Sequence, residues 1–324
     1  MKLLLKISLL LLVATIFASY RHQMEVAREG NHNDTVPQNS IYHWKTVFDV
    51  DSAENSFLKK HGIDRIYLRM FDVATEQNLI SGDKEVVPIA TTRFDSPVPS
   101  GIEIVPVTYI TLDALKGMSG RESEFAALIV ERLLVMASYN KCGEIKEVQF
   151  DCDWTRNTKE SYSKLCRAAK DSLHSKGIEL SITVRLHQLD ETPPPADRGV
   201  LMIYNTGALK DPCTNNSILH IDDVEPYMKP RKYAIPLDYA YPNFSWGVKF
   251  NRGKFSSIVS YDDHNISGNE YIRYERASTY MILLTKKLIE ENFGKPERGN
   301  ILYHLDYSQL KNYTDDEISE IFSF

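Results

Sequence analysis

Eight short extended segments recur along this chain, and most of them are separated by stretches with the apolar spacing of amphipathic helices. We expect strands at 41–50, 63–73, 101–110, 144–154, 178–189, 199–207, 232–242 and 300–308. Strands that alternate with helices predict a parallel sheet. Eight of them in one chain are most simply arranged as an α/β fold with a single closed (β/α)8 TIM-like barrel.

Two connections in this pattern lack a clear helix. Residues 84–101, after the second strand, are extended and rich in proline, and residues 217–229, after the sixth strand, leave room for only a short helix. We therefore expect a barrel that is imperfect around strands 2–3 and 6–7. An open doubly wound sheet is less favoured, because no glycine-rich phosphate turn follows any strand. Helices are predicted at 51–62, 121–140, 159–177 and 270–294.

The first 19 residues have the layout of a secretory signal peptide. Lys2 and Lys6 flank the start of an apolar run, which ends in the small residues Ala18 and Ser19. This run is shorter than the roughly 20 residues that a membrane span requires, and no later segment is long and apolar enough. We expect a polar leader at 20–40, a barrel domain at 41–324, and export to the periplasm or the cell exterior. An uncleaved N-terminal anchor is the alternative to a signal peptide.

Composition excludes some classes of partner and cofactor. The net charge is −6, and no long run of basic residues suggests a nucleic-acid-binding face. The four cysteines are Cys142, Cys152, Cys166 and Cys213. They could form disulfides in an exported chain, but Cys152 and Cys166 also fit buried free thiols. No Cys/His spacing suggests zinc, no cofactor is expected, and the oligomeric state stays open.

The fourth strand carries acids on one face only. In the segment EVQFDCDWT, Glu147 to Thr155, the apolar face consists of Val148, Phe150, Cys152 and Trp154. The opposite face carries Gln149, Asp151 and Asp153. Barrel strands have one face under the helices and one in the interior, and active sites gather at the C-terminal mouth. We therefore expect Asp151 and Asp153 to point inward near the mouth.

The fifth strand repeats this arrangement, with Arg185 and His187 on its inward face. Isolated buried charges cost several kcal/mol each unless they are paired, so a cluster of them suggests a functional site. A structural ion pair of an aspartate with Arg185 or Arg69 is the alternative for any one residue. A divalent cation held by Asp151, Asp153 and His187 is also conceivable, but no further ligand spacing supports it, and no metal is expected.

An apolar strand that ends in D-x-D-W, in a barrel of this length, resembles strand four of family 18 glycoside hydrolases, the chitinase-like enzymes. Their signature is D-x-x-D-x-D-x-E, and Asp151 and Asp153 match its second and third acids. Val148 replaces the first acid, and Thr155 replaces the glutamate that serves as general acid. Over most of its mature length the chain is still more similar to an uncharacterised bacterial barrel family of unknown function.

The resemblance implies an oligo- or polysaccharide partner and leaves two hypotheses. The first, which the sequence favours because of the inward charged cluster, is an exported glycoside-hydrolase-like enzyme that acts on carbohydrate at the mouth. The second is the alternative. Thr155 favours a non-catalytic carbohydrate-binding barrel, similar to the chitinase-like lectins, because the usual proton donor is missing. Side chains from one strand point in parallel, so Asp151 and Asp153 would rarely flank a glycosidic bond from opposite sides. A partner from across the barrel, Asp238 or Asp306, is more plausible, and we predict Asp238 as a third catalytic residue.

Further residues near strand ends are predicted to bind substrate. The polar and aromatic candidates besides Arg185 and His187 are Trp44, Arg69, Asn205, Tyr239, Tyr241, Trp246 and Asp306. Segment 238–250 is unusually aromatic, and we expect a loop whose flat rings either stack on sugars or pack over the barrel rim. Loop acids that could replace the missing glutamate are Glu191, Asp262, Asp263 and Glu270.

Overall fold

The computed structural model describes residues 38–78 and 82–324, which belong to one compact unit. The predicted signal peptide, 1–19, lies outside the described residues, as does the predicted leader up to residue 37. Within the described ranges, no helix has the length and apolar character needed to cross a membrane.

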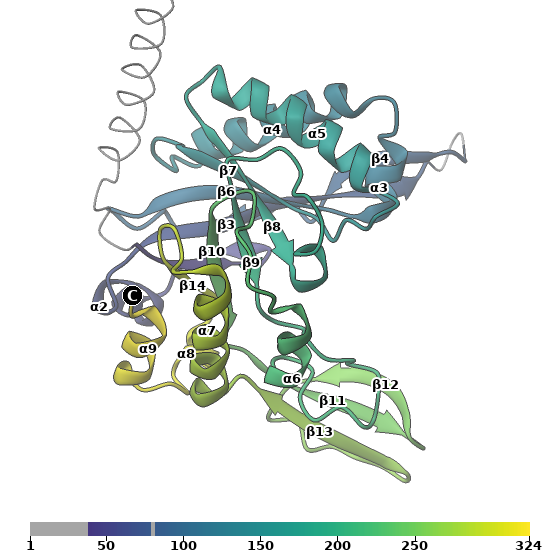
Figure 1. Cartoon of the computed structure of the whole chain (residues 1–324), viewed down its shortest axis with the longest axis vertical. Coiled ribbons are helices and arrows are strands. Elements are labelled where there is room, and N and C mark those ends of the chain that lie inside the picture. Colours follow the sequence, from purple (N-terminus) through teal and green to yellow (C-terminus); the bar gives the residue numbers. More distant parts are fainter. Residues whose placement is uncertain (1–37, 79–81) are drawn as a thin grey trace, which may run out of the picture. The chain divides into compact units, whose positions relative to one another are not determined.

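The central element is a closed barrel of eight parallel strands (Figure 1). In sheet order these strands are β1 (Asn39–His43), β3 (Ile63–Gln77), β6 (Glu103–Ile110), β7 (Glu147–Asp151), β8 (Glu179–Arg185), β9 (Arg198–Met202), β10 (Leu237–Pro242) and β14 (Asn300–Tyr303). Strand β1 pairs in parallel with both β3 and β14, which closes the sheet. The predicted TIM-like fold is therefore confirmed, and each predicted strand has its counterpart.

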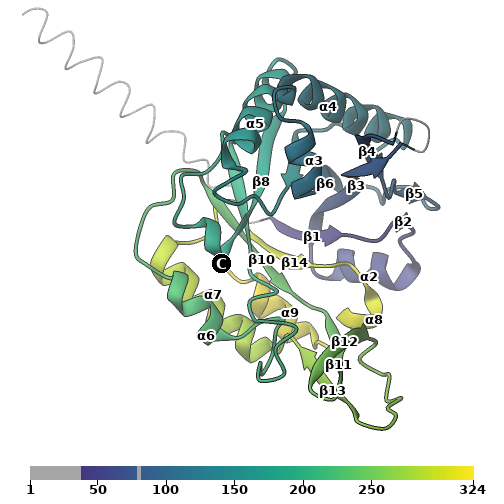
Figure 2. The ribbon, with the colours of Figure 1, turned by 90° about the vertical axis from the view of Figure 1, so that its right-hand side faces the viewer.

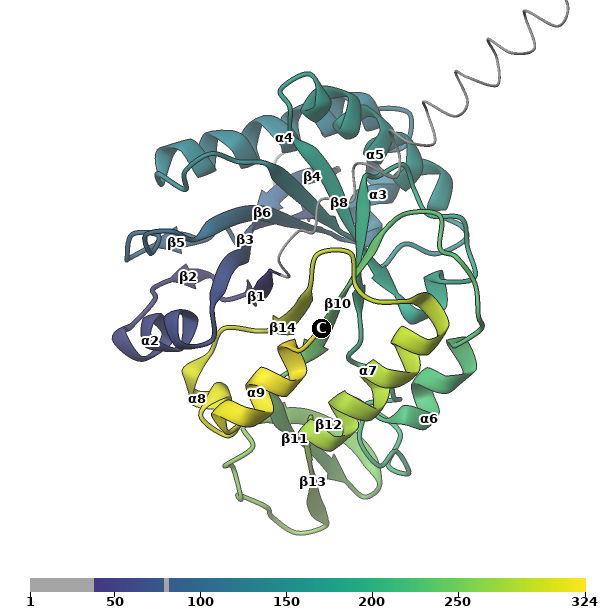
Figure 3. The ribbon, with the colours of Figure 1, turned by 60° about the vertical axis from the view of Figure 1, so that its left-hand side comes forward.

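Helices surround the strands, as Figure 3 shows. The longer ones are α2 (Ser52–Lys60), α4 (Glu122–Tyr139), α5 (Lys159–His174), α7 (Thr279–Phe293) and α9 (Asp315–Phe322). Side-chain caps fix where several begin: Asp51 accepts from the Glu54 amide, and Thr314 forms a capping box with Glu317. The shorter helices are α3 (Leu112–Gly117), α6 (Ile221–Val224) and α8 (Tyr307–Leu310).

The barrel is irregular where the sequence predicts it. After β3 the chain turns back as β4 (Lys84–Ile89), which pairs antiparallel with the end of β3. The two-residue strands β2 (Val47–Phe48) and β5 (Arg93–Phe94) pair beside it. Between β9 and β10 the chain forms only α6 and a 3₁₀ turn at Glu225–Tyr227.

A small antiparallel sheet is inserted between β10 and α7. It consists of β11 (Ser245–Asn251), β12 (Lys254–Val259) and β13 (Glu270–Arg276), and it lies at the bottom of Figures 1 and 2. The helix predicted at 270–294 is wrong in its first part, because Glu270–Arg276 pairs residue by residue with β11. The helix begins only after Ser278, whose hydroxyl accepts from the Met281 amide. The loop predicted where the chain leaves the seventh strand is therefore mostly a strand, β11, while the strand predicted up to residue 242 is confirmed as β10.

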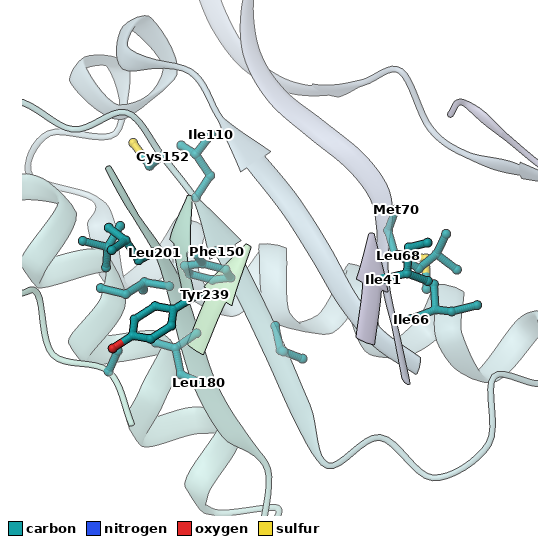
Figure 4. Close-up of a cluster of buried hydrophobic side chains, with 14 of the residues drawn as sticks. Ile41, Ile66, Leu68, Met70, Ile110, Phe150, Cys152, Leu180, Leu201 and Tyr239 are labelled. Carbon is teal, nitrogen blue, oxygen red and sulfur yellow. The ribbon is translucent and has the colours of Figure 1, made fainter. Parts of the chain in front are cut away.

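The main core lies between the strands and the helices. Outward-facing side chains of neighbouring strands fill it, and Figure 4 shows Phe150, Leu180, Leu201 and Tyr239 close to one another. Val148, Phe150, Cys152 and Trp154 all belong to this core, as the alternation of the fourth strand predicts. The four cysteines are free thiols, and only Cys213 is exposed.

Candidate functional site

The inward faces of β7 and β8 bring the two predicted acids to the C-terminal mouth of the barrel. Asp151 is the last residue of β7, lies beside Tyr109 of β6, and is only 2% exposed. Asp153 follows two residues later, and its side chain is 46% exposed. Below them, Gln149 accepts a hydrogen bond of 2.7 Å from Tyr42 and donates one of 3.2 Å to Ser181. The predicted register of β7 is therefore correct.

Arg185, the last residue of β8, connects the two carboxylates. Its Nε donates to Asp153 Oδ1 at 2.5 Å, and its Nη2 donates to Asp151 Oδ1 at 3.1 Å. Thr183 donates its hydroxyl to the same oxygen of Asp151 at 2.5 Å. One guanidinium therefore balances part of the charge of two acids, the arrangement in which buried charges are tolerated.

Burial changes the protonation of this cluster. It raises the pKa of Asp151 above the usual range, although Arg185 and the Thr183 hydroxyl act in the opposite direction. Burial also raises the pKa of Tyr204 to about 12, so this phenol stays neutral at physiological pH. Tyr204 lies below the guanidinium of Arg185, whose Cζ is 5.6 Å from the ring centre.

Three aromatic residues at the ends of β1, β9 and β14 cover the barrel interior beside this cluster. Trp44, Tyr204 and Tyr303 are half-buried and pack on the inward apolar residues below them. Tyr204 and Tyr303 stack with their ring centres 4.5 Å apart, and Trp44 lies 5.8 Å from Tyr303. The mouth thus combines flat apolar faces with charged hydrogen-bonding groups.

A cleft of about 270 Å³ opens at this place. Its polar lining includes Asp153, Arg185, His187 and Asn205, all of which the sequence predicts as site residues. A neighbouring depression of about 260 Å³ shares His187 and is lined by Thr155, Arg156 and Glu191. The two hollows therefore adjoin at His187, and the second reaches Thr155, where the resemblance predicts a glutamate.

Glu191 is the acid that could take the place of a glutamate at position 155, because it lines the same depression as Thr155. It forms ion pairs with Lys159 at 3.0 Å and with Arg156 at 3.1 Å. Hydrogen bonds from Lys159 and Arg156 lower the pKa of Glu191 below the usual range. Glu191 is therefore ionised at neutral pH and poorly suited to donate a proton.

Arg69 also lies at the mouth, but a neighbour engages it. A β-bulge around Met70 places Arg69 and Asp72 on the same side of β3, where they form hydrogen bonds of 2.7 and 2.5 Å. The Arg69 guanidinium lies 5.8 Å from the centre of the Trp44 ring. Asp72 is absent from the residues predicted from the sequence, because a bulge shifts the alternation of side chains by one residue.

Tyr204 and Tyr303 are likewise absent from the predicted residues. The alternation of side chains along the two strands could have predicted that both tyrosines face inward. Tyr204 shares a face with Met202, and Tyr303 shares a face with Ile301, and both Met202 and Ile301 face inward. Their proximity to each other depends on barrel closure, in which β14 and β9 both flank β10.

Three predicted residues of β10 do not lie at the mouth. Strand seven begins at Leu237, not at 232, so Asp238 is near its start, at the N-terminal end of the barrel. There Asp238 accepts from the amides of Arg298 and Gly299 at 2.6 and 3.1 Å. Tyr239 and Tyr241 have the opposite parity to Asp238 and point into the outer core. These positions correct the predicted placement of Asp238 as a catalytic residue and of both tyrosines as substrate-binding residues.

Trp246 and Asp306 have structural partners. The indole of Trp246 donates to Glu275 at 2.8 Å and packs on Phe244, with ring centres 5.1 Å apart. Asp306 accepts from the Ser308 amide at 3.1 Å, which caps α8, and lies 3.8 Å from Lys45. Both residues therefore have partners within the loops around the mouth, and their role in substrate binding stays a prediction.

Comparison with known proteins identifies the fold. No family model and no curated protein sequence matches this chain. Among solved structures, a chitinase from Chromobacterium violaceum is similar with a TM-score of 0.55 and 13% identity, over 88% of this chain and 98% of that one. The spore cortex-lytic enzyme SleL of Bacillus megaterium gives 0.54 and 13%, over 89% and 74%. A class V chitinase from Nicotiana tobaccum gives 0.52 and 10%, over 88% and 97%. This chain therefore has the barrel fold of the chitinases and chitinase-like proteins.

Proposed function

We propose that this protein binds an oligosaccharide at the C-terminal mouth of the barrel and does not hydrolyse it. The observation that carries the proposal is the ion pair of Asp153 with Arg185, at 2.5 Å, beside a position where threonine replaces the expected acid. The guanidinium occupies Asp153 Oδ1, whereas a general acid must be placed to donate a proton to the glycosidic oxygen of its substrate.

The other carboxylates near the mouth are engaged in the same way. Within the described part of the chain, Asp72 pairs with Arg69, Glu191 pairs with two cations, and Asp306 lies beside Lys45. Asp151 keeps a raised pKa, but it is buried below Asp153. Each inward acid that favours hydrolysis when only the sequence is considered is thus paired with at least one cation, and this pairing favours binding.

The rest of the mouth suits a sugar. Sugar rings present apolar C–H faces that stack on aromatic rings, together with hydroxyls that hydrogen-bond to charged and amide groups. Trp44, Tyr204 and Tyr303 supply the first kind of surface, and Arg185 and Asn205 supply the second. A structural neighbour supports the ligand class: a mutant of the Nicotiana tobaccum class V chitinase is in complex with NAG4, at a TM-score of 0.50 and 10% identity to this chain. Export, expected from residues 1–19, would place the protein where such glycans occur.

Hydrolysis is the second candidate, and one observation favours it. Asp153 lines the cleft with its side chain 46% exposed, so its carboxyl is accessible to a ligand. Binding of substrate could displace Arg185 and leave Asp153 as an acid–base group. An assay of turnover separates the two functions directly.

The test combines binding with reducing-end release on one panel of oligosaccharides, starting with the N-acetylglucosamine tetramer. We expect the natural protein to bind at least one glycan and to release no reducing ends. Asp153→Asn should weaken binding because the charged partner of Arg185 is lost, while Asp171→Asn, an exposed control on α5, should not. Turnover that falls by about 10²-fold or more in Asp153→Asn, with binding retained, would establish hydrolysis instead.

A further inference from the structure

A second, larger cleft lies between the inserted sheet and the segment 307–313 that follows β14. Its volume is about 480 Å³, and its polar lining includes Ser245, Tyr261, Asp262, Arg276, Lys311 and Asn312. The sheet and its loops contribute the first four of these residues, and the post-β14 segment contributes the other two. We call this the second cleft.

The walls of the second cleft are held together by hydrogen bonds. Ser245 donates to Gln309 at 2.7 Å, which ties β11 to α8. Tyr313 donates to the carbonyl of Ala277 at 2.6 Å, and Asn243 donates to the carbonyl of His304 at 2.9 Å. These bonds connect residues more than 30 positions apart in the sequence, so the cleft is built by tertiary structure and is pre-formed.

The two cations of the second cleft differ from those of the mouth. At the mouth, Arg69 and Arg185 each form an ion pair with an aspartate. Among the described residues, neither Arg276 nor Lys311 forms an ion pair, and the second cleft contains a single lining acid, the exposed Asp262. Arg276 also acts electrostatically on Glu317, which is not part of the lining. Within the lining itself, two cations and one carboxylate leave an excess of one positive charge beside hydroxyl and amide groups.

The second cleft lies next to the mouth. Phe244 lines the second cleft, and its ring centre is 6.0 Å from those of Tyr204 and Tyr303, which cover the barrel interior. A chain of sugar units that occupies the mouth would cross a single aromatic ring to enter the second cleft. The two cavities can therefore serve one extended ligand.

We propose that the second cleft binds an anionic substituent, a carboxylate or a sulfate, on a saccharide whose neighbouring units lie in the mouth. This inference rests on the proposed function and specifies the ligand as an acidic oligosaccharide. Arg276 provides the planar donor group that matches a carboxylate or sulfate, and Lys311 provides a second positive charge. Hydroxyl and amide side chains such as Ser245 and Asn312 complete the hydrogen-bonding surface.

Calorimetric titration of the full chain with tetrasaccharides of equal length tests the proposal. The probes are the neutral N-acetylglucosamine tetramer, tetragalacturonate, and a sulfated tetrasaccharide, with the last two distinguishing the carboxylate from the sulfate. We expect at least one acidic probe to bind more tightly than the neutral one. The double variant Arg276→Gln/Lys311→Gln should lose about tenfold in affinity for that acidic probe and retain its affinity for any neutral probe that binds.

Two controls separate this inference from general charge effects. Lys254→Gln removes one positive charge from the same sheet at an exposed position outside the second cleft, and it should leave all affinities unchanged. The preference for the acidic probe should shrink in high salt, because exposed charges are screened within about 10 Å at 0.1 M salt. Both Arg276 and Lys311 are exposed, so their variants should fold, which circular dichroism checks.

The outcomes distinguish this inference from the proposed function. Binding of the neutral probe with no preference for either acidic probe would overturn the inference and leave the function in place. Acidic binding that depends on Arg276 and Lys311 but not on Asp153 would support the second cleft and contradict the mouth as a sugar site. Failure of every probe to bind would overturn both.

Discussion

The interior of this barrel carries charged side chains at both ends, and the two groups differ in what they can contact. At the N-terminal end, Arg298 donates to Glu147 at 2.6 Å and to Glu179 at 2.7 Å, and Arg198 donates to Glu179 at 3.2 Å. Arg65 pairs with Glu103 at 3.0 Å in the same layer. The side chain of Glu147 is only 1% exposed, whereas that of Glu179 is 40% exposed, so only the Glu147 side of this layer is closed to solvent.

At the C-terminal end, Arg185 likewise joins two acids, but Asp153 reaches the surface and lines a cleft. Three half-buried aromatic rings border the charged group at the C-terminal end. The buried Tyr67 and the first residues of the strands border the charged group at the N-terminal end. Charge inside a barrel is therefore no sign of function by itself. The position at the mouth, the adjoining cleft and the neighbouring aromatic surface separate a candidate site from a structural network.

The largest expected effect comes from breaking the N-terminal network. Glu147→Ala leaves Arg298 and Arg198 without a buried partner, and we expect a loss of about 3–5 kcal/mol in the free energy of unfolding. Urea denaturation measures it. Asp153→Ala, at the partly exposed site, should change stability by less than about 1 kcal/mol and should instead reduce sugar binding. Equal destabilisation by both variants would contradict the division into a structural and a functional end.

A smaller loss of stability is expected at low pH, and it comes from His43 at the C-terminal end of β1. His43 is buried, neither ring nitrogen has a hydrogen-bond partner within the described residues, and its ring packs on Phe48. Burial, with Lys45 and His304 nearby, lowers the pKa of His43 to about 3 from its ordinary 6.5. The folded state thus excludes the proton that the unfolded chain accepts. Burial of the neutral His43 therefore costs no stability above pH 6.5, and the free energy of unfolding decreases as the pH falls from 6.5 toward 3.

Between pH 7 and pH 5 this titration should cost about 2 kcal/mol of stability, at about 1.36 kcal/mol per pH unit. Urea denaturation of His43→Leu at both pH values checks it, since the variant should lose less stability on acidification than the natural protein does. His304, whose pKa burial also lowers, would account for part of the remaining loss. If His43→Leu loses as much stability between pH 7 and pH 5 as the natural protein does, His43 does not contribute to the pH dependence of stability.

The parts of the molecule that can be predicted well from the sequence are those with a strict alternation of side chains. In β7 and β8 polar and apolar residues alternate without interruption, so the inward orientation of Asp151, Asp153 and Arg185 follows from the sequence. In β3 the bulge at Met70 breaks the alternation, and the pairing of Arg69 with Asp72 becomes visible only in the structure.

The errors have physical causes of the same kind. Residues 232–236 look extended, so a strand that begins at Leu237 is predicted too early, and Asp238 is moved from the start of the strand toward its end. Segment 270–276 has aromatic residues that fit a helix as well as a strand, and its pairing with β11 decides the outcome. The second cleft is beyond prediction from sequence, because its two walls are far apart along the chain and meet only in the folded protein.

The central claim is that the C-terminal mouth, and not the charged N-terminal end, binds carbohydrate. Hydrogen exchange measured by mass spectrometry, with and without the tightest-binding oligosaccharide of the panel, tests it most directly. We expect slower exchange in peptides that cover residues 153–156, 185–188 and 202–207, and no change in those that cover 237–240 and 298–300. Protection at the N-terminal end, or no protection with any sugar, would contradict the account.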